Sequence, residues 1–214
     1  MSNVANLKPA FIPVHAPQNP RRRKILVAAT TGASAVGAGF LVVPFLKTWL
    51  PSERAKAVGA PVEVDISKLE AGAMQTVLWQ GKVVYILRRT DDMLASLPLV
   101  EGNLRDPDSK ESIQPEYAKN EWRSERKDVL VMLGICTHLG CAPKLQSRAE
   151  GREVRGDASW EGGFFCPCHG SKFDYAGRVF KGVPAPTNLK IPPYNFQNEN
   201  LVVVGVSSEG GKNG

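Results

Sequence analysis

The sequence predicts a mainly β protein with one membrane-spanning helix near its N-terminus. Two observations lead to this interpretation: residues 25–46 contain no charged side chain, and several later segments alternate apolar with polar residues or form short apolar runs. The 214 residues are 43% hydrophobic and 22% charged, which is typical of a folded protein. We therefore expect an N-terminal anchor followed by an antiparallel β domain.

The net charge of +6 comes from the N-terminal region. Of the 27 Lys and Arg residues, six lie in residues 1–50, which contain no Asp or Glu, and the other 21 balance the 21 acidic residues that follow. A basic patch on the folded domain is therefore not indicated, and nucleic acid is not an expected partner. Four of the six basic residues, 21–24, directly precede the apolar run, which is a membrane-orientation signal.

Residues 1–24 are interpreted as a cytoplasmic tail and residues 25–50 as a single transmembrane helix. The uncharged run is long enough to cross a hydrocarbon core at about 1.5 Å per residue. The positive-inside rule then places the remainder of the chain on the far side of the membrane. A cleaved secretory signal is the alternative, although its apolar region would span only about 7–15 residues. The triplet Ala55-Lys56-Ala57, which could mimic a cleavage site, keeps that alternative open.

Within the basic cluster, residues 22–26 (RRKIL) are similar to a twin-arginine export signal, which carries folded proteins across the membrane. Basic dipeptides before membrane helices are common, so this similarity gains weight only from a cofactor site further along the chain. Residues 51–61 (PSERAKAVGAP) are small and polar. We interpret them as a hinge between the helix and the folded domain.

The β domain begins at Val62. Residues 62–66 alternate, residues 74–79 and 82–88 flank a predicted turn at Gln80-Gly81, and residues 128–135 form another apolar run. Residues 194–196 and 201–206 are expected to form a terminal hairpin. A short helix is predicted at 91–97, and the polar residues 99–127 are interpreted as a surface insertion of helix and loop.

Two short segments hold all four cysteines and two of the three histidines: residues 136–141 (CTHLGC) and 166–171 (CPCHGS). His15, in the N-terminal tail, receives no role. Thiolate sulfur and imidazole nitrogen bind both zinc and iron. A zinc site would use pairs such as Cys-x2-Cys and His-x3-His, whereas each segment here offers one cysteine and one histidine plus a further cysteine. Zinc remains the alternative to iron at this point.

The pattern Cys136-x-His138-x-Gly140-Cys141 with Cys166-Pro167-Cys168-His169-Gly170-Ser171 resembles the cluster-binding motifs of the Rieske iron-sulfur proteins. The resemblance implies that a [2Fe-2S] cluster is bound by the metal ligands Cys136, Cys166, His138 and His169. It also implies a disulfide between Cys141 and Cys168, which can persist outside the cytoplasm and would stabilise the fold by roughly 3 kcal/mol.

Mixed ligation has an electrostatic consequence. Two ferric irons, two sulfides and two thiolates sum to zero charge, so this centre accepts an electron more readily than a centre with four thiolates. The reduction potentials agree: they are about −150 to +300 mV for Rieske centres and about −400 mV for plant-type ferredoxins. Reduction of the iron is also expected to raise the pKa of the histidine ring nitrogen that does not bind it. Electron and proton uptake are thereby coupled, which suits a quinol donor.

Two neighbouring residues are expected to tune the cluster. By the resemblance, the Ser171 hydroxyl donates a hydrogen bond to a cluster sulfide. Many family members place a tyrosine two residues later whose hydroxyl reaches a ligand thiolate, but this chain has Phe173. The proline-rich residues 182–186 (GVPAP) look like the loop that covers the cluster in respiratory members.

The wider resemblance, from about Arg21 to Val206, is to Rieske subunits of bacterial cytochrome bc1 complexes. It includes residues 104–107 (LRDP) and 86–90 (ILRRT). It implies a single-pass protein of the inner membrane in a dimeric complex with cytochrome b and cytochrome c1. Residues 62–214 would form a periplasmic Rieske domain, with a cluster-binding subdomain at about 134–186.

The function implied is that of the redox subunit of a quinol:cytochrome c oxidoreductase, which takes an electron from ubiquinol and passes it to cytochrome c1. His169, His138 and Leu139 would face the quinol site, where a histidine accepts the proton. The alternative is the electron-transfer subunit of another periplasmic oxidase, such as arsenite oxidase. A Rieske oxygenase would need a second iron site, for which only His15 remains.

Overall fold

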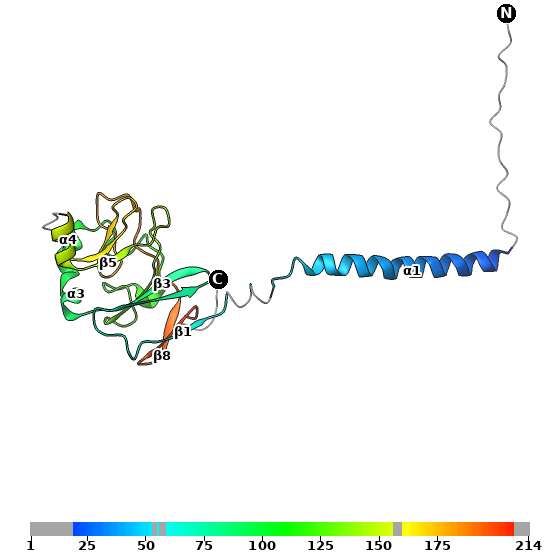
Figure 1. The fold of residues 1–214 in the computed structure, drawn as a ribbon, viewed down its shortest axis with the longest axis horizontal. Coiled ribbons are helices and arrows are strands. Elements are labelled where there is room, and N and C mark those ends of the chain that lie inside the picture. Colours follow the sequence, from blue (N-terminus) through cyan, green and yellow to red (C-terminus); the bar gives the residue numbers. More distant parts are fainter. Residues whose placement is uncertain (1–18, 53–54, 56–58, 156–159, 208–214) are drawn as a thin grey trace, which may run out of the picture. The chain divides into compact units, whose positions relative to one another are not determined.

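The computed structural model describes the chain except for residues 1–18, 53–54, 56–58, 156–159 and 208–214 (Figure 1). Two compact units divide the chain, the first ending at Ser52 and the second starting at Glu53. The predicted tail is described only from Asn19 onward. The predicted hinge, residues 51–61, falls largely on residues outside the described ones, as does most of the Ala55-Lys56-Ala57 triplet.

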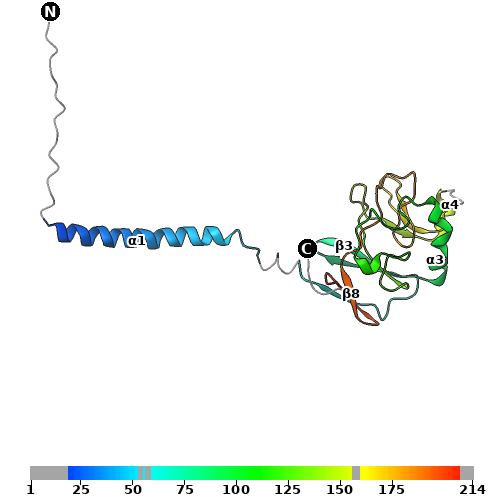
Figure 2. The ribbon, with the colours of Figure 1, turned by 180° about the vertical axis from the view of Figure 1, so that it is seen from behind.

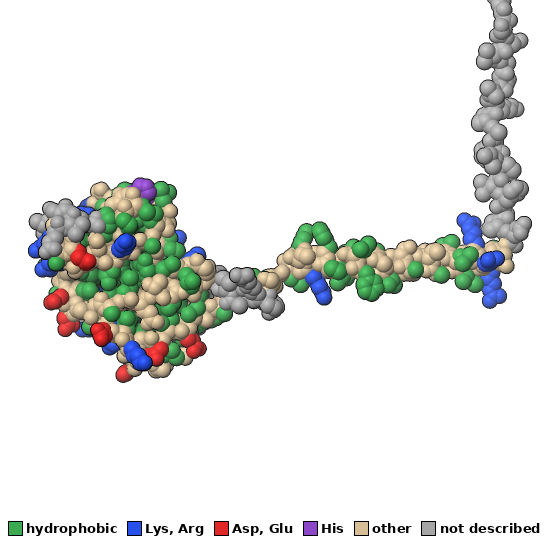
Figure 3. Space-filling view, viewed as in Figure 1, with side chains coloured by type: hydrophobic (Ala, Val, Ile, Leu, Met, Phe, Trp, Pro, Cys, Tyr) green, Lys and Arg blue, Asp and Glu red, His purple; other side chains and the backbone are tan. Residues whose placement is uncertain are grey.

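Helix α1 (Pro20–Lys47) forms the first unit. The side chain of Asn19 caps it by accepting a hydrogen bond from the N–H of Arg22 at 3.0 Å, and Pro20 occupies a first-turn position that needs no N–H. None of its residues is buried; the Lys and Arg side chains gather at its N-terminal end, and Lys47 is the one basic residue in its last turn (Figure 3). The helix is long and apolar enough to cross a membrane. It begins at Pro20, just before the basic cluster at residues 21–24, and ends at Lys47, so both ends lie earlier than the predicted bounds 25–50.

The first sheet joins the two ends of the β domain. Strand β1 (Val62–Asp65) pairs with β9 (Leu201–Val204), which pairs in turn with β8 (Tyr194–Asn198), and both pairings are antiparallel. The predicted strand at 62–66 and the terminal hairpin are therefore present. In β1 only Val64 is buried, between the exposed Glu63 and Asp65, whereas β9 buries Val202, Val203 and Val204 in succession.

The second sheet is an antiparallel meander of β2 (Met74–Trp79), β3 (Lys82–Arg88) and β4 (Val129–Leu133). Gln80 and Gly81 both have positive φ, 51° and 70°, as the two central residues of a type I′ hairpin turn require. All five residues of β4 are buried, which explains why its sequence is a continuous apolar run rather than an alternating one. The antiparallel β prediction is confirmed.

The third sheet was not foreseen from residue patterns. It consists of β5 (Lys144–Gln146), β6 (Gly163–Phe165) and β7 (Lys172–Phe173), again antiparallel. These strands have only two or three residues each, too few to show an alternation. All of them lie within residues 134–186, the subdomain that the resemblance implies.

Helices occupy the segments between strands. Thr90 caps α3 (Asp91–Ser96) by accepting a hydrogen bond from the N–H of Met93, close to the predicted helix at 91–97. The insertion at 99–127 contains two short 3-10 helices, η1 (Pro98–Asn103) and η2 (Glu116–Ala118), together with turns and the isolated bridge residues Leu104 and Arg126. A further helix, α4 (Arg148–Arg155), was not predicted. In Figures 1 and 2, α3 and α4 lie on the same side of the β domain.

Tyr85 of β3 connects the second sheet to the third. Its buried ring stacks on Phe164 of β6, with centroids 6.3 Å apart and an interplanar angle of 12°. Its hydroxyl donates to the carbonyl of Pro143 at 3.0 Å. A Cβ atom at Gly134 would lie 2.5 Å from the ring, so only glycine fits there. Gly134 and Pro143 flank residues 136–141, and Tyr85 therefore fixes both ends of the first cysteine segment.

Replacement of Gly134 by alanine tests this packing. The new methyl group collides with the Tyr85 ring, which cannot retreat without breaking its bond to Pro143, and we expect a loss of about 1–3 kcal/mol in the free energy of unfolding. The control is Gly102→Ala, where no atom lies within 4 Å of the added methyl. Thermal unfolding of the detergent-solubilised chain should show a lower midpoint for Gly134→Ala only; equal midpoints would contradict the prediction.

Candidate metal centre

Two loops beside the third sheet carry eight of the nine predicted site residues. The first loop (Cys136–Cys141) follows β4 and precedes β5, and the second loop (Cys166–Ser171) joins β6 to β7. Phe173, the ninth residue, is fully buried in β7. Loops that the sequence separates by some 25 residues thus meet at one place, because the intervening strands β5 and β6 pair with each other.

The two loops share one backbone pattern. In each, the first cysteine donates its N–H to the last residue of the loop and accepts a hydrogen bond from a glycine N–H. The four bonds measure 2.8, 3.0, 2.8 and 3.0 Å: Cys136 N to Cys141 O, Gly140 N to Cys136 O, Cys166 N to Ser171 O and Gly170 N to Cys166 O. The two glycines adopt left-handed φ values of 84° and 78°, which other residues rarely do. The first cysteines of the two loops are therefore structurally equivalent.

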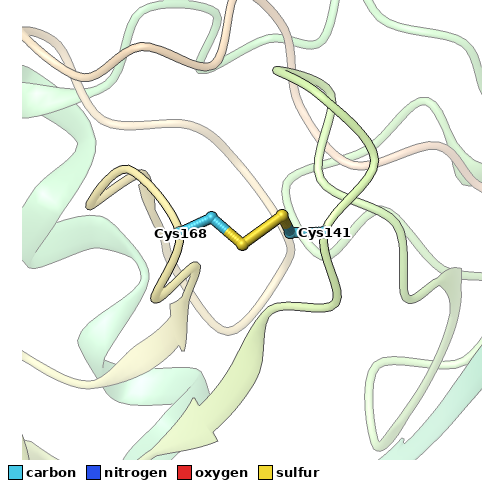
Figure 4. The surroundings of a disulfide bond; sticks show 2 residues. All are labelled: Cys141 and Cys168. Carbon is cyan, nitrogen blue, oxygen red and sulfur yellow. A yellow bond between two sulfur atoms is a disulfide. The ribbon is translucent and has the colours of Figure 1, made fainter.

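A disulfide between Cys141 and Cys168 joins the loops (Figure 4). This is the pairing that the resemblance implies. The bond connects residues 27 positions apart, for which the loop-entropy model gives about 3.5 kcal/mol of stabilisation. It also fixes the distance between the loops.

The other two cysteines, Cys136 and Cys166, are free and buried, with 3% and 2% of their surface exposed. Burial raises the pKa of the Cys136 thiol and the adjacent Cys166 thiol adds to this, whereas hydrogen bonds from the His138 backbone and the Ser171 side chain lower it. The Cys136 thiol thus favours its neutral form. A metal cation bound to them would instead stabilise the thiolates.

The sulfur atoms of Cys141, Cys166 and Cys168 lie within 4.8 Å of one another, a distance at which three sulfurs could share a metal ion. Two of these sulfurs belong to the disulfide, however, and only a thiolate is a good metal ligand. The proximity therefore places the disulfide next to the free thiol of Cys166. It does not define a three-cysteine site.

The two histidine rings meet between the loops. The centroids of His138 and His169 are 4.8 Å apart and their planes are perpendicular, at 89°. The Nδ1 atom of His138 is buried without a hydrogen-bond partner among the described residues, a situation that costs about 1–3 kcal/mol unless another group satisfies it. His169 and Leu139 are exposed, Leu139 by 70%. A histidine side chain is visible in Figure 3 at the surface of the domain, beside hydrophobic side chains.

The donor set therefore has two sides. Two buried thiols lie on the inner side, and two imidazoles lie toward the surface. These four groups fit a metal centre that prefers sulfur and nitrogen ligands, and the unpartnered Nδ1 of His138 is an atom that such a centre would satisfy.

The proline-rich residues 182–186 lie against the second loop. The N–H of Ala185 donates to the hydroxyl oxygen of Ser171 at 3.1 Å, and both residues are fully buried. Just beyond this segment, the carbonyl of Thr187 accepts a hydrogen bond from the hydroxyl of Thr137 in the first loop, at 2.7 Å. The segment thus contacts both loops.

Sequence reasoning did not identify Thr137, Ala185 or Tyr85 as residues that hold the site. Thr137 lies inside the first motif, so its hydroxyl could have been noticed as a donor. Ala185 acts through its backbone, which leaves no side-chain signal. Tyr85 belongs to a distant strand, and its role depends on a tertiary contact that the sequence does not display.

A family model described as the Rieske [2Fe-2S] domain matches residues 116–193, which include all nine predicted site residues. A second model, "Ubiquitinol-cytochrome C reductase Fe-S subunit TAT signal", matches residues 14–52. The ubiquinol-cytochrome c reductase iron-sulfur subunit of Allochromatium vinosum is 51% identical over 187 residues, covering 87% of this chain and 89% of that protein. This chain belongs to the family of ubiquinol-cytochrome c reductase iron-sulfur subunits. The resemblance to Rieske proteins is confirmed.

One further relative has the same name, and one solved structure is also similar. The ubiquinol-cytochrome c reductase iron-sulfur subunit of Bradyrhizobium diazoefficiens is 38% identical over 188 residues, covering 87% of this chain and 96% of that protein. A solved chain of a hyperthermophilic respiratory complex III is 26% identical, with a TM-score of 0.45, and covers 83% of this chain and 98% of its own.

Membership of this family identifies the cofactor as a [2Fe-2S] cluster and the chain as a redox subunit of an oxidoreductase complex. The twin-arginine similarity of residues 22–26 is supported by the TAT-signal match. Together with the apolar helix α1, that match indicates that this iron-sulfur subunit is anchored in a membrane.

Proposed function

We propose that this chain transfers single electrons from ubiquinol to cytochrome c1 within a quinol:cytochrome c oxidoreductase. The observation that carries the proposal is the arrangement of the four donor groups: buried thiols on the inner side, a buried unpartnered Nδ1 on His138, and an exposed His169. The names of the relatives, ubiquinol-cytochrome c reductase iron-sulfur subunits, support this function.

Cys136, Cys166, His138 and His169 would hold the [2Fe-2S] cluster, with the disulfide between Cys141 and Cys168 beside them. When bound, the cluster accepts and releases one electron. The buried Nδ1 is the atom that His138 would use as a ligand, because no described residue satisfies it. The fully buried Ser171 hydroxyl, in the same loop as Cys166, would donate a hydrogen bond to a cluster sulfide, which withdraws charge from the centre and favours reduction.

The exposed histidine side of the site would face the quinol. Oxidation of a quinol releases protons as well as electrons, and the exposed ring of His169 can accept one proton at a nitrogen that does not bind iron. Leu139, which follows His138 in the first loop and is 70% exposed, offers an apolar contact for the quinone ring or for the protein wall around it. Most of that wall would come from cytochrome b.

The fixed orientation of the chain is part of the proposal. We place the N-terminus in the cytoplasm and residues 62–214 in the periplasm. Residues 51–61 would act as the hinge that lets the domain move between its partners. The basic residues 21–24 at the start of α1 support this orientation, and the disulfide is compatible with an oxidising compartment.

Protease accessibility tests this orientation. Trypsin added to intact spheroplasts should release the β domain from the membrane, because residues 51–61 contain Arg54 and Lys56 as cleavage sites. The domain can be followed with an antibody. A domain that is cleaved only after the spheroplasts are lysed would contradict the periplasmic placement.

Isolation from native membranes tests the function. The affinity-tagged full chain, solubilised in detergent, should copurify with b-type and c-type haem, detected in reduced-minus-oxidised spectra. The same fraction should catalyse quinol-dependent reduction of cytochrome c. The expected complex is a dimer that contains cytochrome b and cytochrome c1. Recovery of the chain without haem, in company with a molybdenum protein, would instead support an oxidase of the arsenite oxidase type.

The absence of a tyrosine hydroxyl at Phe173 predicts a relatively low reduction potential. Phe173→Tyr should add a hydrogen bond to a ligand thiolate. A bond worth about 1 kcal/mol in favour of the reduced state raises the potential by roughly 40 mV for a one-electron centre. Redox titration followed by electron paramagnetic resonance (EPR) of the cluster measures this shift.

Phe196→Tyr is the matched control. It adds the same hydroxyl group to a half-buried phenylalanine of β8, in the first sheet. The potential should not move in this variant. If Phe173→Tyr binds its cluster normally and its potential also stays in place, the proposed hydrogen bond does not form.

A further inference from the structure

The proline-rich residues 182–186 are held by a buried side chain that directly follows them. Asn188 is fully buried, and its side-chain oxygen accepts a hydrogen bond from the N–H of Val179 at 2.8 Å. The bond closes the segment from Val179 to Asn188 into a loop. Residues 182–186 lie within that loop, so their position depends on Asn188.

The amide nitrogen of the same side chain attaches this loop to the insertion. Asn188 Nδ2 donates to the carbonyl of Asp106 at 2.9 Å and to the hydroxyl oxygen of Ser109 at 3.0 Å. Its backbone N–H donates to the hydroxyl oxygen of Ser112 at 3.2 Å. Asn188 therefore joins the loop from Val179 to Asn188 to the turn at residues 106–112.

One buried carboxylate, that of Asp106, fixes the positions of these acceptor atoms in the insertion. Asp106, only 6% exposed, accepts hydrogen bonds from the backbone N–H groups of Lys110 and Glu111 and from the hydroxyl of Ser112 at 2.7 Å. Since the Ser112 proton points to Asp106, the Ser112 oxygen is left to accept from Asn188. The turn at residues 106–112 is thus a preformed socket for Asn188.

At the other end, the loop determines how Ser171 is oriented. A hydroxyl has one proton to donate, and the oxygen of Ser171 accepts from the N–H of Ala185 at 3.1 Å. The Ser171 proton must therefore point away from Ala185, and it is left to donate within the loop that also carries Cys166. A displaced Ala185 would leave the hydroxyl free to rotate.

We infer that Asn188 is a positioning residue for the metal centre: it fixes residues 182–186 so that the Ala185 amide aims the Ser171 hydroxyl into the site and keeps the reduction potential high. The inference rests on the proposed function, in which the site holds a [2Fe-2S] cluster. It assigns to the insertion at residues 99–127, through Asp106 and Ser112, a role in setting that potential.

A double-mutant cycle of Asn188→Ala and Ser171→Ala in the full-length, membrane-extracted protein tests the inference. Each single change should lower the equilibrium constant for reduction, by up to about fivefold, or roughly 40 mV at 59 mV per tenfold change. If Asn188 acts through Ser171, then Asn188→Ala should cause no further change once Ser171 is absent. EPR-monitored redox titration supplies all four potentials.

Ser124→Ala is the control for a merely structural effect. Ser124 is also fully buried and accepts a hydrogen bond from Arg89 at 2.6 Å, but it contacts neither site loop in the hydrogen bonds described. This variant should lower the unfolding temperature without moving the potential. Hydrogen exchange adds a readout that does not involve electron transfer: the Ala185 amide should exchange faster in Asn188→Ala and at the normal rate in Ser124→Ala.

If Asn188→Ala fails to fold, Ser112→Ala is used in its place. Ser112 is half-buried, and its substitution removes only one of the hydrogen bonds of Asn188. An unchanged potential in a folded variant with a bound cluster would overturn the inference. So would a decrease that is equally large with and without Ser171. A wild-type protein that shows no cluster signal at all would contradict the proposed function itself, and the inference with it.

Discussion

The site depends on holding two loops of distant sequence at one fixed separation. A metal centre with ligands from both loops tolerates little change in that distance, because metal–ligand bonds are short and directional. The disulfide between Cys141 and Cys168 sets the separation covalently, on the same side as Cys166. Tyr85 contributes to the same separation, because it contacts the backbone at both ends of the first loop and stacks on Phe164 in β6, the strand before the second loop. Residues 182–187 set it a third time, by hydrogen bonds to each loop.

Buried polar groups give this arrangement its specificity, since each must find a partner or cost about 1–3 kcal/mol. Arg123 shows the principle: it is fully buried, burial lowers its pKa to about 10, and it donates to the carbonyls of Ala176, Gly177 and Leu189. These carbonyls flank the proline-rich segment on both sides. The polar insertion is therefore not a passive surface loop, because Arg123 and Asp106 inside it organise the chain that lies over the site.

The parts of the structure that the sequence predicted are those with local signals. Strand β3, the Gln80-Gly81 turn and helix α1 all show in period, turn chemistry or length. The third sheet does not, because strands of two or three residues carry no period. The resemblance implied a cluster-binding subdomain at about 134–186, without specifying a sheet within it. The ligand types could be read from the cysteine and histidine spacing, whereas the supporting contacts of Tyr85 and Asn188 are non-local and leave no pattern in the sequence.

The burial of the donor groups constrains how electrons can enter and leave. The thiols of Cys136 and Cys166 are enclosed, while His169 and Leu139 lie at the surface. Within the proposed function, donor and acceptor must both approach this one exposed edge, and they cannot occupy it together. Under this proposal the domain moves between cytochrome b and cytochrome c1 while its internal geometry stays unchanged. The three constraints on the loops fit this proposal, because a site that is held rigidly keeps the same reduction potential whichever partner the domain contacts.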